Sequence, residues 1–102
     1  MTLREKVKSD LAEIRYYYAR KDIFAKAFDS IGKCGILEKV EKYNEAICKA
    51  PLMIYEIYDM LFVHYRTHEQ AAEILGYSPN YIYKAAVRLY SYFEKYFSEE
   101  VA

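Results

Sequence analysis

The sequence predicts an all-α fold of about five helices, and three observations lead to this prediction. The 102 residues include only three Gly and two Pro, too few turn-forming residues for an all-β protein. Apolar residues recur three and four positions apart over most of the chain, which is the period of amphipathic helices. The chain is 54% hydrophobic with a formal net charge of zero, so it is not intrinsically disordered, and its length is typical of one domain.

The first predicted element is a long N-terminal helix from about residue 3 to about residue 30. It opens with a Thr2-x-x-Glu5 capping box, whose side chains satisfy backbone N–H groups at the start of a helix. The segment Gly32-Lys33-Cys34-Gly35 then ends the helix and supplies a turn. The apolar stripe of this helix comprises Leu3, Val7, Leu11, Ile14, Tyr18, Ile23, Phe24, Ala27, Phe28 and Ile31.

Two further helices are predicted on either side of Pro51. Proline disfavours a helical conformation for the residue before it, so the first of the two ends near Ala50. The second begins at Pro51, because proline suits the first position of a helix. This second helix, residues 52–63, is apolar on nearly every face, and we expect it in the middle of the fold. The apolar stripe of the first comprises Ile36, Leu37, Val40, Tyr43 and Ile47.

The last third of the chain predicts a short helix, a sharp turn and a long helix. Thr67-x-x-Gln70 is a second capping box and marks the start of the short helix. Gly76 accepts positive φ and makes the turn. Ser78 is a strong N-cap, and Pro79 then occupies the favoured first position of the last helix. The last helix runs to about residue 98 on the apolar stripe Tyr81, Ile82, Ala85, Ala86, Leu89, Phe93 and Phe97.

Two helices joined by a short turn that contains Gly are typical of the helix-turn-helix motif. The small Ala71 and Ala72 allow the two helices to cross closely, and Ile82 anchors the second helix. The outward face of the second helix is then free to enter the major groove of DNA. That face carries Pro79, Asn80, Tyr83, Lys84, Val87 and Arg88.

These residues resemble a known family. The segment from Pro51 through Leu89 is similar to the region-four helix-turn-helix of bacterial sigma factors and their single-domain relatives in phages and mobile elements. The match covers under half of the chain, and its Leu-Gly-x-Ser core fixes a turn geometry rather than a DNA sequence. The whole chain is also similar to small prophage-encoded proteins of Gram-positive bacteria that are described as transcriptional regulators. The matching residues are Pro51, Thr67, Ala71, Ala72, Leu75, Gly76, Ser78 and Ile82, with Glu41-Lys42-Tyr43-Asn44-Glu45-Ala46 in the longer match.

The resemblance implies binding to double-stranded DNA. In such a complex Asn80 would pair with adenine, and Lys84 or Arg88 with guanine. The sequence departs from the family in offering only these two cations on the recognition helix, where family members commonly have more. The residues that the resemblance assigns to the groove are Ser78, Asn80, Tyr83, Lys84 and Arg88, and those near phosphates are Thr67 and His68.

A second hypothesis keeps the fold and changes the partner. Region-four domains also bind RNA polymerase or another protein, and a tyrosine-rich, nearly neutral chain is compatible with that role alone. The charge around the recognition helix distinguishes the two hypotheses. Convergence of Lys84 and Arg88 with Arg66 and Lys95 favours DNA. A surface shared with the acidic residues favours a protein partner, and these residues are Glu69, Glu73 and Glu94.

The N-terminal helical element, residues 1–50, is expected to pack on the helix-turn-helix region, residues 51–102, within a single compact domain, and also to serve dimerisation. Many helix-turn-helix proteins bind DNA as dimers. The run Tyr16-Tyr17-Tyr18 must turn one ring outward, and that ring is the candidate homodimer contact. Residues 1–50 carry eleven Lys and Arg against eight Asp and Glu, and residues 51–102 carry four against seven. A local patch must therefore provide any contact with nucleic acid.

The sequence does not predict a membrane protein, a metal-binding protein or an enzyme. The sequence has no apolar run long enough to cross a membrane and opens with charged residues, so we expect a cytoplasmic protein with free thiols at Cys34 and Cys48. His64 and His68 are four residues apart but straddle a predicted helix break, so no metal site is expected. No nucleophile stands with a base, and no carboxylate pair is evident, so we expect neither an enzyme nor a cofactor.

Overall fold

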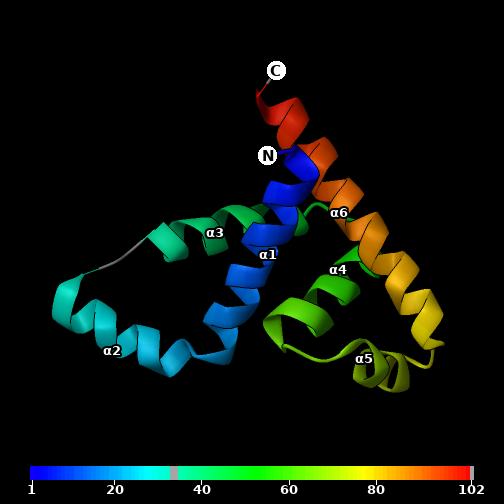
Figure 1. Cartoon of the computed structure of the whole chain (residues 1–102), viewed down its shortest axis with the longest axis horizontal. Helices are drawn as coiled ribbons and strands as arrows, with labels where there is room; N and C mark the ends of the chain where they lie inside the picture. The colour runs from blue at the N-terminus through cyan, green and yellow to red at the C-terminus, as the bar shows by residue number, and fades with distance from the viewer. Residues whose placement is uncertain (33–34, 102) are drawn as a thin grey trace.

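The computed structural model describes residues 1–32 and 35–101, and the chain is all-α (Figure 1). No strand occurs within this described part. The helices do not include one that is both long enough and apolar enough to cross a membrane, again within residues 1–32 and 35–101. In chain order the elements are α1 (Leu3–Ala19), α2 (Lys21–Ile31), α3 (Gly35–Ile47), α4 (Leu52–Tyr58), the π-helical turn η1 (Asp59–Val63), α5 (His68–Leu75) and α6 (Pro79–Val101).

The predicted N-terminal helix over residues 3–30 is wrong in one respect, because it is two helices that meet at Arg20. The backbone of Arg20 leaves the helical region, with φ −128° and ψ 33°, and its N–H donates to the carbonyl of Tyr17. The bend returns Phe24 toward α1, where its ring centroid lies 5.4 Å from that of Tyr17 and 6.2 Å from that of Tyr16. A straight continuation would carry the apolar face of α2 away from the rest of the chain.

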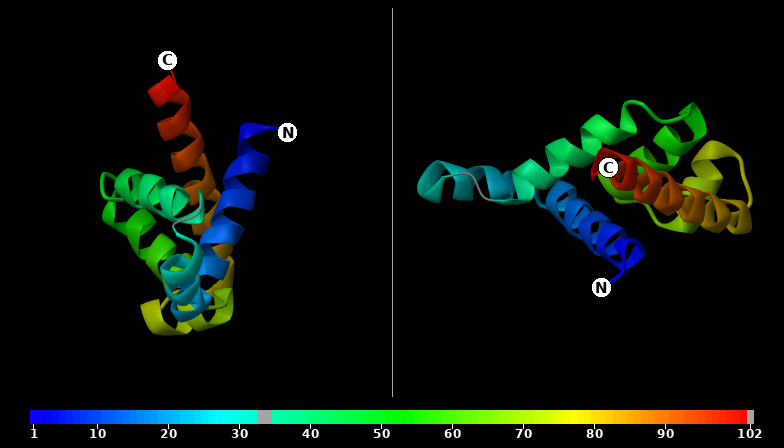
Figure 2. Two further views of the ribbon diagram at one scale, coloured as in Figure 1. Left: turned by 90° about the vertical axis from the view of Figure 1, so that its left-hand side faces the viewer. Right: turned by 90° about the horizontal axis from the view of Figure 1, so that it is seen from above.

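One hydrophobic core joins both halves of the chain. α1 packs against η1, α3 and α6, and its start lies beside the C-terminal part of α6 (Figures 1 and 2). By contrast, α2 extends away from this core and contacts α1 near the bend, through Phe24. The largest fully buried side chains come from α1, α3, α4 and α6, and they are Val7, Leu11, Ile14, Tyr43, Ile57, Ile82, Leu89 and Phe93.

A buried carboxylate links α1 to α3. The hydroxyl of Tyr43 donates to Asp10 at 2.7 Å, and the ammonium groups of Lys39 and Lys6 lie 3.0 and 3.1 Å from its oxygens. Burial alone would raise the pKa of Asp10, but the hydrogen bonds from Tyr43, Lys39 and Lys6 outweigh it and lower that pKa. Lys39 also pairs with Glu13 at the rim of this cluster.

The predicted central helix over residues 52–63 forms, but its winding changes part-way. It begins as α4, with Pro51 as its N-cap residue instead of its first residue, and widens into η1 after Tyr58. The chain then turns through Tyr65, whose φ of 42° is in the left-handed region. Arg15 of α1 stabilises this turn, because its guanidinium donates to the carbonyl oxygens of Leu61 at 3.1 Å and Tyr65 at 3.0 Å.

Candidate nucleic-acid interface

The short helix α5 and the long helix α6 are joined by the turn that the sequence predicts. Thr67 accepts a hydrogen bond from the backbone of Gln70, and the Gln70 side chain accepts one from Thr67, so the capping box is complete. Gly76 ends α5 with φ 76°, in the left-handed region. The hydroxyl of Ser78 accepts from the N–H of Tyr81 at 3.2 Å and caps α6.

Small side chains hold the two helices together. Ala71 and Ala72 of α5 are buried, and Ala85 and Ala86 of α6 are buried too. α5 packs directly against α6, and Ile82, which is fully buried, anchors the first turns of α6. These positions match the prediction, and they fix the direction in which the opposite face of α6 points.

The opposite face of α6 is open to solvent. Asn80, Tyr83, Lys84, Val87 and Arg88 are all exposed. Within residues 1–32 and 35–101, the side chains of Asn80, Lys84 and Arg88 make no hydrogen bond or ion pair. Their polar atoms are therefore available to a partner.

Thr67, His68 and Ser78 differ in that their side chains make contacts within the fold. The hydroxyl oxygens of Thr67 and Ser78 accept backbone hydrogen bonds, so these two residues define the helix ends. The half-buried ring of His68 stacks on the ring of Tyr83, with centroids 4.1 Å apart and an interplanar angle of 9°. The stack ties the N-terminus of α5 to the exposed face of α6.

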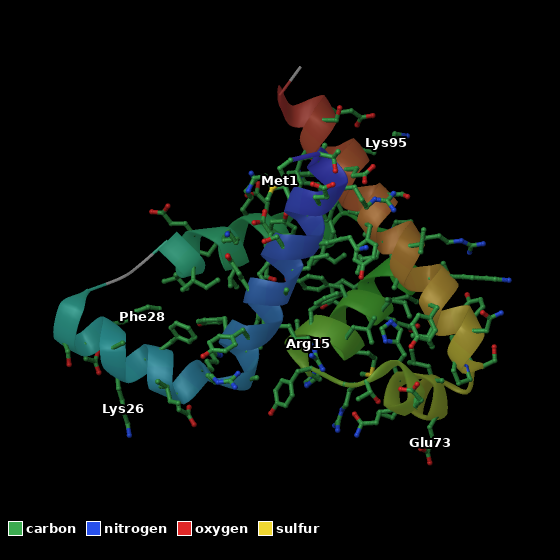
Figure 3. All side chains as sticks on the ribbon, in the orientation of Figure 1. Met1, Arg15, Lys26, Phe28, Glu73 and Lys95 are labelled. Carbon is green, nitrogen blue, oxygen red and sulfur yellow. The ribbon has the colours of Figure 1, made fainter. Side chains whose placement is uncertain are left out.

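The charges around α6 divide between two sides. Lys84, Arg88 and Lys95 are exposed and, by their spacing of four and seven residues, follow one face of the helix. Glu94 turns from this face and pairs with Arg4 of α1. Figure 3 shows Lys95 near the C-terminal end of α6 and Glu73 on the far side of α5. Lys84, Arg88 and Lys95 thus share one face of α6, whereas Arg66, which precedes α5, lies beside that face in a neighbouring cleft.

Arg66 belongs to a cleft between α1, η1, α5 and α6. The cleft encloses about 270 Å³. Its two cations, Arg15 and Arg66, face one carboxylate, Glu69. Burial raises the pKa of the Tyr90 hydroxyl in this cleft, against an opposing influence of Arg4. The lining comprises Arg15, Leu61, Phe62, Arg66, Thr67, His68, Glu69 and Tyr90.

Sequence reasoning missed the contribution of α1 to this region. Arg4, Lys8 and Arg15 are spaced by four and seven residues, which is a signal that they share one helix face. Their contacts with particular residues of α6 and η1 could not be predicted from the sequence, because 39 residues separate the end of α1 from the start of η1.

The remaining candidate positions are placed as follows. Of the three successive tyrosines, Tyr16 is the outward one at 53% exposure, and Tyr17 is buried. Cys48 is exposed, and Cys34 lies outside the described residues. His64 pairs with Asp59 at 3.4 Å, and the described part of the chain brings together no three His, Cys, Asp or Glu side chains that would suit a metal ion.

Comparison with known proteins gives no relative. No protein-family model matches the chain, and neither a curated protein nor a solved structure is similar enough to count as a match.

Proposed function

We propose that this chain is a DNA-binding transcriptional regulator of the phage or mobile-element type. The α5–turn–α6 unit acts as a helix-turn-helix, and the first turns of α6 enter the major groove of double-stranded DNA. The supporting observation is that Asn80, Lys84 and Arg88 are exposed and have no polar partner among the described residues, on a helix that Ser78 caps and Ile82 anchors.

Each exposed side chain has a role in this proposal. Asn80 presents a donor and an acceptor, which suit the two hydrogen-bonding atoms of adenine. Lys84 and Arg88 carry donors for the acceptors of guanine. Tyr83 covers the flank of the groove with its ring on His68, and Thr67 and His68 lie toward the phosphates.

An alternative partner is RNA polymerase or another regulator, and exposed apolar residues favour it. Ile74 and Tyr77 are 54% and 43% exposed near the turn, and Val87 is 52% exposed on the outward face of α6. Apolar and aromatic side chains of this kind form the centres of protein interfaces. A homodimer is the expected assembly under the first proposal, with Tyr16 as the candidate contact, because two copies would read two half-sites of one operator.

DNA binding is tested by fluorescence anisotropy, with labelled duplexes from the locus that encodes the chain and with scrambled duplexes, across a salt series. The wild type should prefer the locus duplex, and the logarithm of its affinity should fall linearly with the logarithm of salt concentration. The double variant Lys84→Glu/Arg88→Glu should lose roughly 100-fold or more in affinity, since each base contact contributes about 1–3 kcal/mol. Its circular dichroism spectrum should match that of the wild type.

The matched control is Lys21→Glu/Lys26→Glu, which changes the net charge equally at two exposed positions of α2. This control should bind like the wild type. Wild-type affinity in the α6 double variant would remove the site assignment. No binding by the wild type at low salt would remove the DNA-binding function, and a pull-down with RNA polymerase would then test the alternative.

A further inference from the structure

We propose that α1 is a second DNA-contacting element, and that Lys8 of α1, together with Arg66 before α5, binds phosphates at the edge of the groove that α6 enters. The inference rests on the proposed function and extends it from the base-reading face of α6 to a surface that spans both halves of the chain. The surface is named here the basic flank and consists of Lys8, Arg15 and Arg66.

The position of α1 places these cations beside α6. At one end of α1, Arg4 pairs with Glu94 of α6 and donates to the hydroxyl of Ser91 at 2.9 Å. At the other end, Arg15 donates to the carbonyls that close the turn before α5. Lys8 lies between them, with its ammonium nitrogen 5.4 Å from the centroid of the Tyr90 ring.

The cations of the basic flank are not neutralised within the described part of the chain. Lys8 and Arg66 are exposed, and neither forms an ion pair with a carboxylate of residues 1–32 or 35–101. Arg15 bonds only carbonyl oxygens there, which leaves its charge uncompensated. Of the nearby acids, Glu94 is paired with Arg4, and Glu69 remains as the one carboxylate that lines the cleft. A chain with zero net charge thus gathers positive charge on this flank.

The basic flank is continuous with the proposed base-reading face. Tyr83 stacks on His68, and His68 lines the cleft together with Arg15, Arg66 and Tyr90. Tyr83 and Tyr90 are seven residues apart on α6, a distance of about 10 Å along the helix. The major groove is about 12 Å wide. A cation beside Tyr90 is therefore within reach of a phosphate that borders the groove when the first turns of α6 face its bases.

The duplex is the occupant that this arrangement favours. The cations lie in a row on long side chains, as suits a backbone that presents one negative charge after another. The cations of the basic flank also add to Lys84 and Arg88, and this local positive charge would allow a chain with zero net charge to bind DNA. An acidic peptide is the competing polyanion, and the experiment separates the two.

The test compares Lys8→Gln and Arg66→Gln with a control, Lys26→Gln, in the full chain. Lys26 is an exposed cation on the far arm α2, well away from Arg15 (Figure 3). Arg15 is left intact because its loss would also release the turn before α5. Each flank variant should bind the locus duplex and the scrambled duplex more weakly by the same factor, and the slope of log affinity against log salt should shrink by about 1. The control should leave both affinities and the slope unchanged.

Two outcomes would overturn the inference. The first leaves the proposed function standing, and the second removes it as well. If the wild type binds the duplex and both flank variants keep its affinity and salt slope, α1 makes no DNA contact and the proposed function stands. If the wild type binds no duplex at low salt, both proposals fail. In that case a labelled poly-glutamate peptide, bound by the wild type and lost in Lys8→Gln, would assign the basic flank to an acidic protein partner instead.

Discussion

At the scale of single residues, Asp10 shows how this small core accommodates a charge. Its carboxylate is 8% exposed and receives hydrogen bonds from one tyrosine and two lysines. Burial opposes ionisation, but these bonds hold the pKa of Asp10 below its ordinary value. The folded state therefore stabilises the ionised carboxylate of Asp10 relative to the unfolded chain, so the free energy of unfolding depends on pH.

The sign of that dependence follows from the lowered pKa. The contribution of Asp10 is fully present above its unfolded pKa of about 3.9 and is lost as the pH falls through the folded value. Asp10→Asn should lower the free energy of unfolding at pH 7 by roughly 2 kcal/mol, because charged hydrogen bonds contribute about that much. It should also flatten the fall in stability below pH 4. Urea unfolding at a series of pH values measures both effects.

Glu13→Gln is the control for this prediction, because Glu13 pairs with the same Lys39 but is 52% exposed. Exposed ion pairs contribute little, so its stability should stay close to the wild type. An Asp10→Asn variant as stable as the wild type at pH 7 would contradict the role given to this carboxylate.

The contacts that Asp10 and Arg15 make with other helices could not be predicted from the sequence. Tyr43, one of the two partners of Asp10 on α3, is 33 residues away from it, and the carbonyl of Leu61 is 46 residues from Arg15. Spacing within a helix identifies neighbours on that helix alone. The polar contacts between helices, including the basic flank, depend on how the helices pack.

At the scale of elements, the boundaries that short-range chemistry sets were predicted well. Thr2 and Thr67 cap their helices, Ser78 caps α6, and Gly76 makes the turn. Each of these features needs only residues three or four positions away. The break at Arg20 was missed because the apolar period continues through it, and the packing of Phe24 on α1 decides where the helix ends.

Gly76 gives an element-scale prediction. An added Cβ at this position would meet no atom within 4 Å, so the cost of Gly76→Ala comes from the backbone, whose φ is 76°. An L-residue in that region costs about 1–2 kcal/mol, and thermal unfolding should show that loss. Gly35→Ala is the matched control, since it also has no neighbour within 4 Å and its φ is not positive. It should unfold at the same or a slightly higher temperature, because alanine restricts the unfolded chain. Equal destabilisation by both substitutions would refute the argument.

At the scale of the whole molecule, the all-α class and the packing of the N-terminal helices on the C-terminal region were both predicted from the sequence. Val7, Leu11 and Ile14 of α1 have no exposed surface, and α1 packs on η1 and α6. The apolar faces of the C-terminal elements are therefore covered by residues from the other half. Periodicity predicts that an apolar face exists, and it does not predict which side chains of the covering helix pack against each position.

A fragment of residues 51–102 tests this interdependence. Without α1 and α3, the fragment loses the partners of η1 and α6, and each large side chain left uncovered forgoes about 1.5–3 kcal/mol of burial. We expect weak helicity and no cooperative transition in urea, measured by circular dichroism. Adding residues 1–50 in trans should restore helicity if the core re-forms. A cooperative transition of the fragment alone would show that the C-terminal half folds independently.

The contact between Arg15 and the turn at Tyr65 constrains how the sequence can change. Arg15 recognises backbone carbonyl oxygens, so the identity of the side chain at position 65 does not enter the contact. Position 65 must only tolerate a left-handed backbone, which Gly and Asn do more readily than Tyr. A substitution at position 15 has no such latitude, because few side chains reach two carbonyls with parallel donors. The turn that leads into α5 therefore depends more on Arg15 of α1 than on the side chain of Tyr65 within the turn itself.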